Sequence, residues 1–197
     1  MLKEIVLKTK NYPKIFIEKS RSYMAQLENH NGSKDFFIRS VKEELGELIS
    51  NKSANNRSLL IDDVVDSTWV LLAGEDYDEV SFIFKFDSSE LSDTITLIED
   101  IENSLIDLIS KYSNGQKINH LVNSIFMNIA KICYINNIDW DKAFKALCDE
   151  NMSKFGFENL SASEYKLHDI FRNNKMNKKD DNGVNYSWFN PADFTIF

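Results

Sequence analysis

The chain has 197 residues, 43% of them hydrophobic, which is enough for one sizeable domain with a packed core and excludes global disorder. Its formal net charge of -8 and its pI of about 5.0 exclude the basic surface that non-specific nucleic-acid binding needs. It contains 6 glycines and 2 prolines, so breakers are scarce and long helices are favoured over many short strands.

The cysteines and the N-terminal residues indicate the compartment. Cys133 and Cys148 form neither a CxxC pair nor a disulfide framework, and free thiols suit a reducing environment. Residues 1–14 lack the apolar core of a signal peptide, and no apolar run approaches the roughly 18 residues of a membrane helix. We therefore expect a cytoplasmic protein, in a bacterium or a phage-infected host, with neither membrane nor nucleic acid as a partner.

Apolar residues at three- and four-residue spacing predict an all-α protein. Helices are expected at 14–29, 34–52, 58–73, 89–112, 117–135, about 139–151 and 162–173. Asp139 is the candidate N-cap of the sixth helix. Near residues 77–87 the apolar residues alternate instead, which predicts a short extended segment. Residues 174–185, rich in Asn and Lys, are typical of an exposed linker.

Two groups of carboxylates lie inside the otherwise apolar second and third predicted helices. They are Glu43, Glu44 and Glu47, and Asp62, Asp63 and Asp66. Residues three or four apart share a helix face, so Glu44 and Glu47 point the same way. Asp63 and Asp66 do the same. Each helix therefore presents at least one pair of carboxylates on one side.

Other choices within each group fit the same geometry, since Glu43 with Glu47 and Asp62 with Asp66 are four residues apart. Converging carboxylates repel one another unless a divalent cation lies between them, and hard oxygen ligands favour Mg²⁺ or Mn²⁺. The alternative is an ordinary solvated face. That alternative is weaker for the aspartates, because aspartate is a poor helix former and their neighbours are apolar.

The spacing of these residues resembles a known family. Glu44-Leu-Gly-Glu47 and Asp63-Val-Val-Asp66 are similar to the ExxE and ExxD motifs of the MazG-like all-α NTP pyrophosphohydrolase superfamily, with Asp63 where the family usually has Glu. Residues 138–155 resemble the segment of phosphoribosyl-ATP-pyrophosphohydrolase-like proteins that ends in an Asn-Met-Ser-Lys box.

The resemblance covers residues 34–74 and 117–160. It implies a pyrophosphohydrolase domain over 1–160, with 75–116 as an insertion, followed by a C-terminal helix and tail over 161–197. The expected fold is a MazG-like helical bundle that assembles as a homodimer or homotetramer.

The resemblance also implies a function, a magnesium-dependent pyrophosphohydrolase that splits a (d)NTP into a (d)NMP and pyrophosphate. Glu44, Glu47, Asp63 and Asp66 are then the ligands of Mg²⁺, for which Mn²⁺ is an alternative. Water attacks the α-phosphorus, with Glu44 or Glu47 as the general base.

Three further residues are candidates for the substrate. The resemblance assigns Asn151 and Lys154 of the Asn-Met-Ser-Lys box to the metal and the substrate phosphates. Trp69 follows Asp66 by about one helical turn and is a candidate for stacking on the base, with a core tryptophan as the alternative.

Two rival functions stay open. One is a non-catalytic nucleotide-binding or sequestering protein on the same scaffold, and the other is a helical interaction module that uses residues 75–116. The sequence does not identify the nucleotide, so dNTPs, phosphoribosyl-ATP and alarmones all remain candidates.

Overall fold

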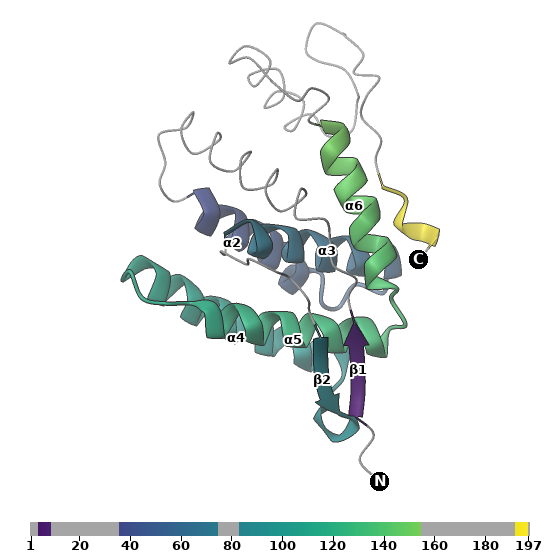
Figure 1. Cartoon of the computed structure of the whole chain (residues 1–197), viewed down its shortest axis with the longest axis horizontal. Helices are drawn as coiled ribbons and strands as arrows, with labels where there is room; N and C mark the ends of the chain where they lie inside the picture. The colour runs from purple at the N-terminus through teal and green to yellow at the C-terminus, as the bar shows by residue number, and fades with distance from the viewer. Residues whose placement is uncertain (1–3, 9–35, 75–82, 155–191, 197) are drawn as a thin grey trace, which may run out of the picture. The chain divides into compact units, whose positions relative to one another are not determined.

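The computed structural model describes residues 4–8, 36–74, 83–154 and 192–196 (Figure 1). These residues belong to two compact units. The first contains 4–8, 36–74, 83–143 and 194–196, and the second contains 144–154 and 192–193. The described residues are mainly helical, which confirms the predicted all-α character. The helices expected at 14–29 and 162–173 lie outside them.

Five α-helices were predicted within the described ranges, and each is present. They are α2 (Phe36–Ser50), α3 (Arg57–Gly74), α4 (Thr94–Ser113), α5 (Asn119–Ile135) and α6 (Trp140–Lys154). Asp139 precedes α6 and its Oδ1 accepts a hydrogen bond from the Lys142 backbone N–H at 3.3 Å, as expected of an N-cap. None of the helices in the described ranges is long and apolar enough to cross a membrane.

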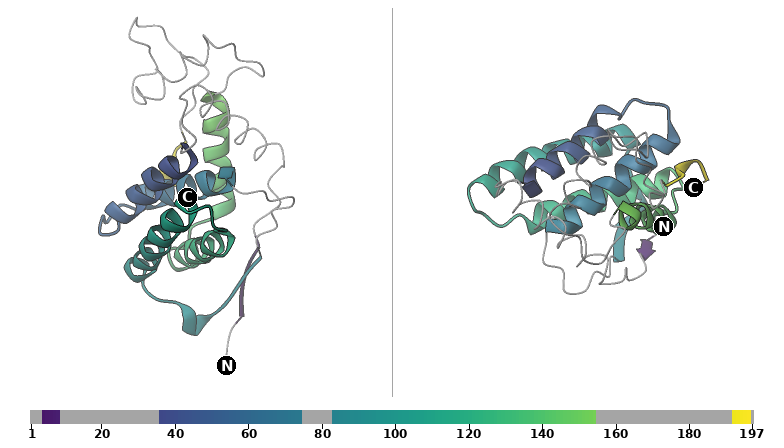
Figure 2. Two further views of the ribbon diagram at one scale, coloured as in Figure 1. Left: turned by 90° about the vertical axis from the view of Figure 1, so that its left-hand side faces the viewer. Right: turned by 90° about the horizontal axis from the view of Figure 1, so that it is seen from above.

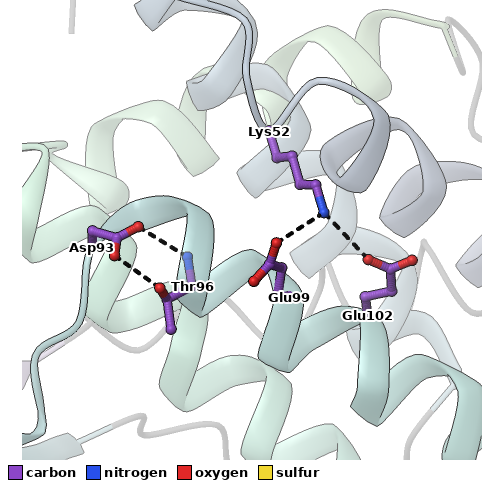
Figure 3. A network of polar contacts seen from close by, with 5 residues as sticks. All are labelled: Lys52, Asp93, Thr96, Glu99 and Glu102. Carbon is purple, nitrogen blue, oxygen red and sulfur yellow. Dashed lines mark hydrogen bonds and ion pairs between the residues drawn. The ribbon is translucent and has the colours of Figure 1, made fainter.

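The start of α4 differs from the prediction, which placed it at residue 89. Asp87 is the N-cap of a 3₁₀-helix, η1 (Ser88–Glu90), and Asp93 is the N-cap of α4, which begins at the next residue. The carboxylate of Asp93 accepts hydrogen bonds from the Thr96 backbone N–H at 3.0 Å and from its hydroxyl at 2.8 Å (Figure 3). Two N-caps close together therefore divide what the apolar pattern presents as one helix.

Four of the helices form the core of the first unit as two pairs, α2 with α3 and α4 with α5 (Figures 1 and 2). Helix α4 also packs on α2, and α3 on α5. Side chains with no more than 1% exposure fill the interior, namely Val41, Leu45, Leu48, Ile61, Val64, Val65, Leu71, Leu97, Ile98, Ile101, Leu108, Val122, Ile125 and Ile132. Residues 75–116, interpreted as an insertion, thus supply one of the four core helices.

Polar contacts join the helix pairs at their ends. Lys52, just after α2, forms ion pairs with Glu99 at 3.3 Å and Glu102 at 3.6 Å, both on α4 (Figure 3). Arg57, at the start of α3, donates hydrogen bonds to the carbonyls of Asn136 and Asn137 that follow α5. The hydrogen bonds from Arg57 satisfy carbonyl groups at the end of α5, where the helix offers no intrahelical partners.

Part of the extended segment predicted near 77–87 forms strand β2 (Ile83–Asp87), and its residues 77–82 lie outside the described ranges. Strand β2 pairs antiparallel with β1 (Glu4–Lys8), a strand that the sequence did not predict. Phe86 of β2 is buried, and its ring packs edge-on against Tyr134 of α5 with centroids 5.9 Å apart. The Lys131 ammonium group lies 5.9 Å from the Phe86 ring centroid, so β2 is anchored on α5.

Both cysteines are buried and free. Burial raises the pKa of the Cys133 thiol far above its usual range, and it raises that of Cys148 to about 12. A thiol that stays protonated is a poor nucleophile and metal ligand, so both residues act as core side chains.

Candidate functional site

Helices α2 and α3 carry the two acidic motifs and run antiparallel to one another. The Ser67 hydroxyl of α3 donates a hydrogen bond to the backbone carbonyl of Glu44 at 3.4 Å. Nearer the connection between the two helices, Asn51 Nδ2 donates to Asp63 Oδ2 at 3.0 Å. These contacts show that the face of α3 with Asp63 and Ser67 lies against the C-terminal half of α2, where Glu44 and Glu47 are found.

Asp63 is the carboxylate that the fold buries. Only 3% of its surface is exposed, and loss of hydration raises the pKa of its carboxyl group from 3.8 to about 6. The hydrogen bond from Asn51 opposes this shift, whereas the negative charges of Asp62 and Glu47 add to it. Glu47 therefore lies close enough across the helix pair to repel the Asp63 charge.

Burial and hydrogen bonding distinguish Asp63 from Asp62, the two candidates that the sequence left open. Asp63 is buried against α2, whereas Asp62 is half-buried. Asp63 is therefore the better candidate for a site shared by both helices. Of the glutamates, Glu43 is exposed and Glu44 is half-buried.

The other predicted residues of this helix pair occupy the border between core and solvent. Glu47 is exposed, and Asp66 and Trp69 are half-buried. A half-buried indole can contribute to the core and still offer part of a ring face to a ligand. Among the four predicted metal ligands, Glu47 and Asp63 interact through their charges, because the negative charge of Glu47 raises the pKa of Asp63.

Asn151 and Lys154 of the Asn-Met-Ser-Lys box form the last turn of α6. They belong to the second compact unit. The backbone there is helical, as expected, and the two side chains lie outside the part of the chain that the structure describes.

A metal site can be tested by the donors that the structure groups together. Within the described ranges, no cluster of three or more His, Cys, Asp or Glu side chains is placed to hold a metal ion by itself. Mg²⁺ at polyphosphate sites usually takes one or two protein carboxylates, and phosphate oxygens and water complete its octahedral shell. Glu47 and Asp63 supply this smaller number of hard oxygen donors.

Asn51 belongs to this site although the sequence did not single it out. It follows Glu47 by four residues, one helical turn, and its backbone N–H donates to the Glu47 carbonyl at 2.9 Å. Its side chain then reaches across to Asp63. The one sequence signal was its spacing from Glu47, which is too common a pattern to identify a role.

Comparison with protein-family models, with curated proteins and with solved structures returned no significant match.

Proposed function

We propose that the chain is a magnesium-dependent nucleotide pyrophosphohydrolase that converts a (d)NTP into a (d)NMP and pyrophosphate, and that it acts as a homodimer or homotetramer. Asp63 is the main support. A buried carboxylate is costly, and the charges that act on this one, from Asp62 and Glu47, are themselves negative. A cation bound between Glu47 and Asp63 would relieve this repulsion. A group of this kind, with a perturbed pKa beside a second carboxylate, is typical of functional sites.

Magnesium, when bound, would neutralise charge on the triphosphate and make its α-phosphorus more electrophilic. Asp63, held by Asn51, would supply a fixed oxygen donor. The exposed Glu47 is accessible to water and would serve as donor and base. The base takes a proton from the attacking water, whose oxygen bonds to the α-phosphorus while the bond to the bridging oxygen breaks and pyrophosphate leaves.

Five further residues have proposed roles. Glu44 and Asp66, both half-buried, would add carboxylate oxygens or, for Glu44, serve as the base instead of Glu47. By the motif resemblance, Asn151 and Lys154 would contact the phosphates, where a compact ammonium charge is suited to a polyphosphate. Trp69 would stack on the base.

The test is a substrate panel. The purified protein is incubated with each NTP and dNTP and with Mg²⁺, and released pyrophosphate is measured. Glu47→Gln and Asp63→Asn should each lower kcat/KM at least about 100-fold, as expected when a base or a charge-stabilising group is lost. Asp107→Asn, which removes an exposed carboxylate of α4, is the matched control and should leave the rate unchanged.

The outcomes separate the rival functions. If no nucleotide is hydrolysed, the enzyme proposal is wrong. Tight nucleotide binding without hydrolysis would then identify a binding or sequestering protein. If thermal stability also stays the same with nucleotide and Mg²⁺, the nucleotide site itself is refuted and an interaction module is favoured.

A further inference from the structure

Strand β1 belongs to a small sheet. In the described part of the chain, β2 is the strand that pairs with β1, giving a two-stranded antiparallel ribbon. An isolated pair of strands is marginally stable in water, and a strand edge without a neighbour presents backbone donors and acceptors to another strand. The edge of β1 that faces away from β2 is therefore a candidate pairing surface.

The register of the ribbon leaves the charged ends of β1 without complementary residues opposite them. Glu4 is paired with Asp87, which places two acidic residues at one position of the ladder. Lys8, at the other end, is paired with the apolar Ile83. Like charges directly opposite one another destabilise an antiparallel pair. The sequence of β1 thus carries an acid and a base that β2 does not match.

The two ends of β1 match each other. Read antiparallel to itself, Glu-Ile-Val-Leu-Lys places Glu4 opposite Lys8 of the partner subunit and Ile5 opposite Leu7 of the partner subunit, with Val6 at the twofold axis. We propose that the edge of β1 that faces away from β2, with which no strand of the described residues pairs, forms a ladder with the same edge of a second copy of this chain, giving a four-stranded sheet in the order β2–β1–β1–β2. A self-complementary patch of this kind is what a twofold dimer requires.

The apolar rows of the two ribbons agree with this pairing. Ile5 is in register with Phe86, which is buried, and Leu7 with Phe84, which is half-buried. In the proposed sheet each row runs Phe86, Ile5, then Leu7 and Phe84 of the partner subunit. The proposed register therefore aligns four apolar residues across four strands, and it places a lysine beside Glu4 on the side away from Asp87. This interface involves none of the residues proposed for catalysis or nucleotide binding, so it is tested separately from hydrolysis.

Cysteine cross-linking tests the register. Residues opposite one another in antiparallel strands have Cα atoms about 4.5 to 5.5 Å apart, within the range of a disulfide, whereas diagonal neighbours are about 7 to 8 Å apart. Under mild oxidation Val6→Cys should therefore form a covalent dimer, and Ile5→Cys, whose copies are diagonal, should not. Equal cross-linking of both variants, or none of Val6→Cys, would overturn the proposed register.

Charge reversal tests the pairing itself. Glu4→Lys and Lys8→Glu should each raise the dimer dissociation constant at least about fivefold in sedimentation equilibrium, because like charges then meet twice across the twofold axis. The double variant should return to the wild-type value. Within one chain, Glu4→Lys also places a lysine opposite Asp87, which replaces a repulsive pair with an attractive one. The substitution should therefore not destabilise the β1–β2 ribbon, and weaker association would come from the interface between the two copies. A monomeric wild type, or a Glu4→Lys protein that dimerises normally, would refute the interface.

Discussion

Replacing Asp63 with Asn removes one buried negative charge and keeps an oxygen that can accept the hydrogen bond from Asn51. The pKa of Asp63 is raised from 3.8 to about 6 in the folded protein, so the folded state keeps this proton to higher pH than the unfolded chain. The free energy of unfolding therefore falls as pH rises from about 4 to about 6. A pKa difference of about two corresponds to about 3 kcal/mol. We expect Asp63→Asn to be more stable than wild type by up to about 3 kcal/mol above pH 7.

Urea unfolding of both proteins from pH 4 to pH 8, in the presence of a metal chelator, measures this difference. The gap between Asp63→Asn and wild type should be small at pH 4 and should reach its full value near pH 7, because all other titrating groups are common to both proteins. A gap that does not change with pH would show that Asp63 is not destabilised by burial. Adding Mg²⁺ should stabilise wild type and leave Asp63→Asn unchanged.

Three further predictions concern single contacts. Asn51→Ala removes the hydrogen bond that lowers the pKa of Asp63, so this pKa should rise above 6. The free energy of unfolding at pH 7 should fall by about 1 to 3 kcal/mol. An NMR titration of the Asp63 carboxyl carbon that shows no change in pKa would contradict this prediction. Ile101→Ala should lower the free energy of unfolding, measured in urea, by about 2 to 5 kcal/mol, because the Ile101 side chain is fully buried. Ile106, on the same helix, is 60% exposed, so Ile106→Ala should lower it by less than about 0.5 kcal/mol. Similar losses in both variants would place α4 outside the core. Lys52→Met should lower the free energy of unfolding by less than about 1 kcal/mol, because its ion pairs with Glu99 and Glu102 are partly exposed. The loss should disappear at about 1 M salt, which screens these charges. A loss that persists in salt would mean that the lysine stem, rather than its charge, stabilises the fold.

The helices were predictable because their signal is local. Apolar residues that face one core recur every three or four positions, and α2, α3, α5 and α6 begin and end within about three residues of the predicted limits. The start of α4 was predicted five residues early, because apolar spacing does not register the capping carboxylates of Asp87 and Asp93. The β1–β2 pairing joins residues about 75 positions apart, and local sequence patterns do not predict pairing over such a distance.

The site was predictable to the level of helix faces. The spacing of Glu44, Glu47, Asp63 and Asp66 indicated that each helix carries carboxylates on one side, and the structure shows the two helices packed together. The sequence did not show which side of α3 faces α2, because apolar residues occur on every side of this helix. Only the packed structure shows that Asp63 is the buried aspartate. The role of Asn51 depends on tertiary pairing, and its spacing from Glu47 is too common a pattern to reveal that role.

The ladder between β1 and β2 also sets an order of events during synthesis. Glu4–Lys8 leaves the ribosome well before Ile83–Asp87, and the roughly 75 residues between them take about 4 to 15 s to translate. Within that interval both helices of the α2–α3 hairpin, whose contacts with each other are local, are synthesised. The early strand spends those seconds as an unpaired apolar segment, a natural target for a chaperone until its partner emerges.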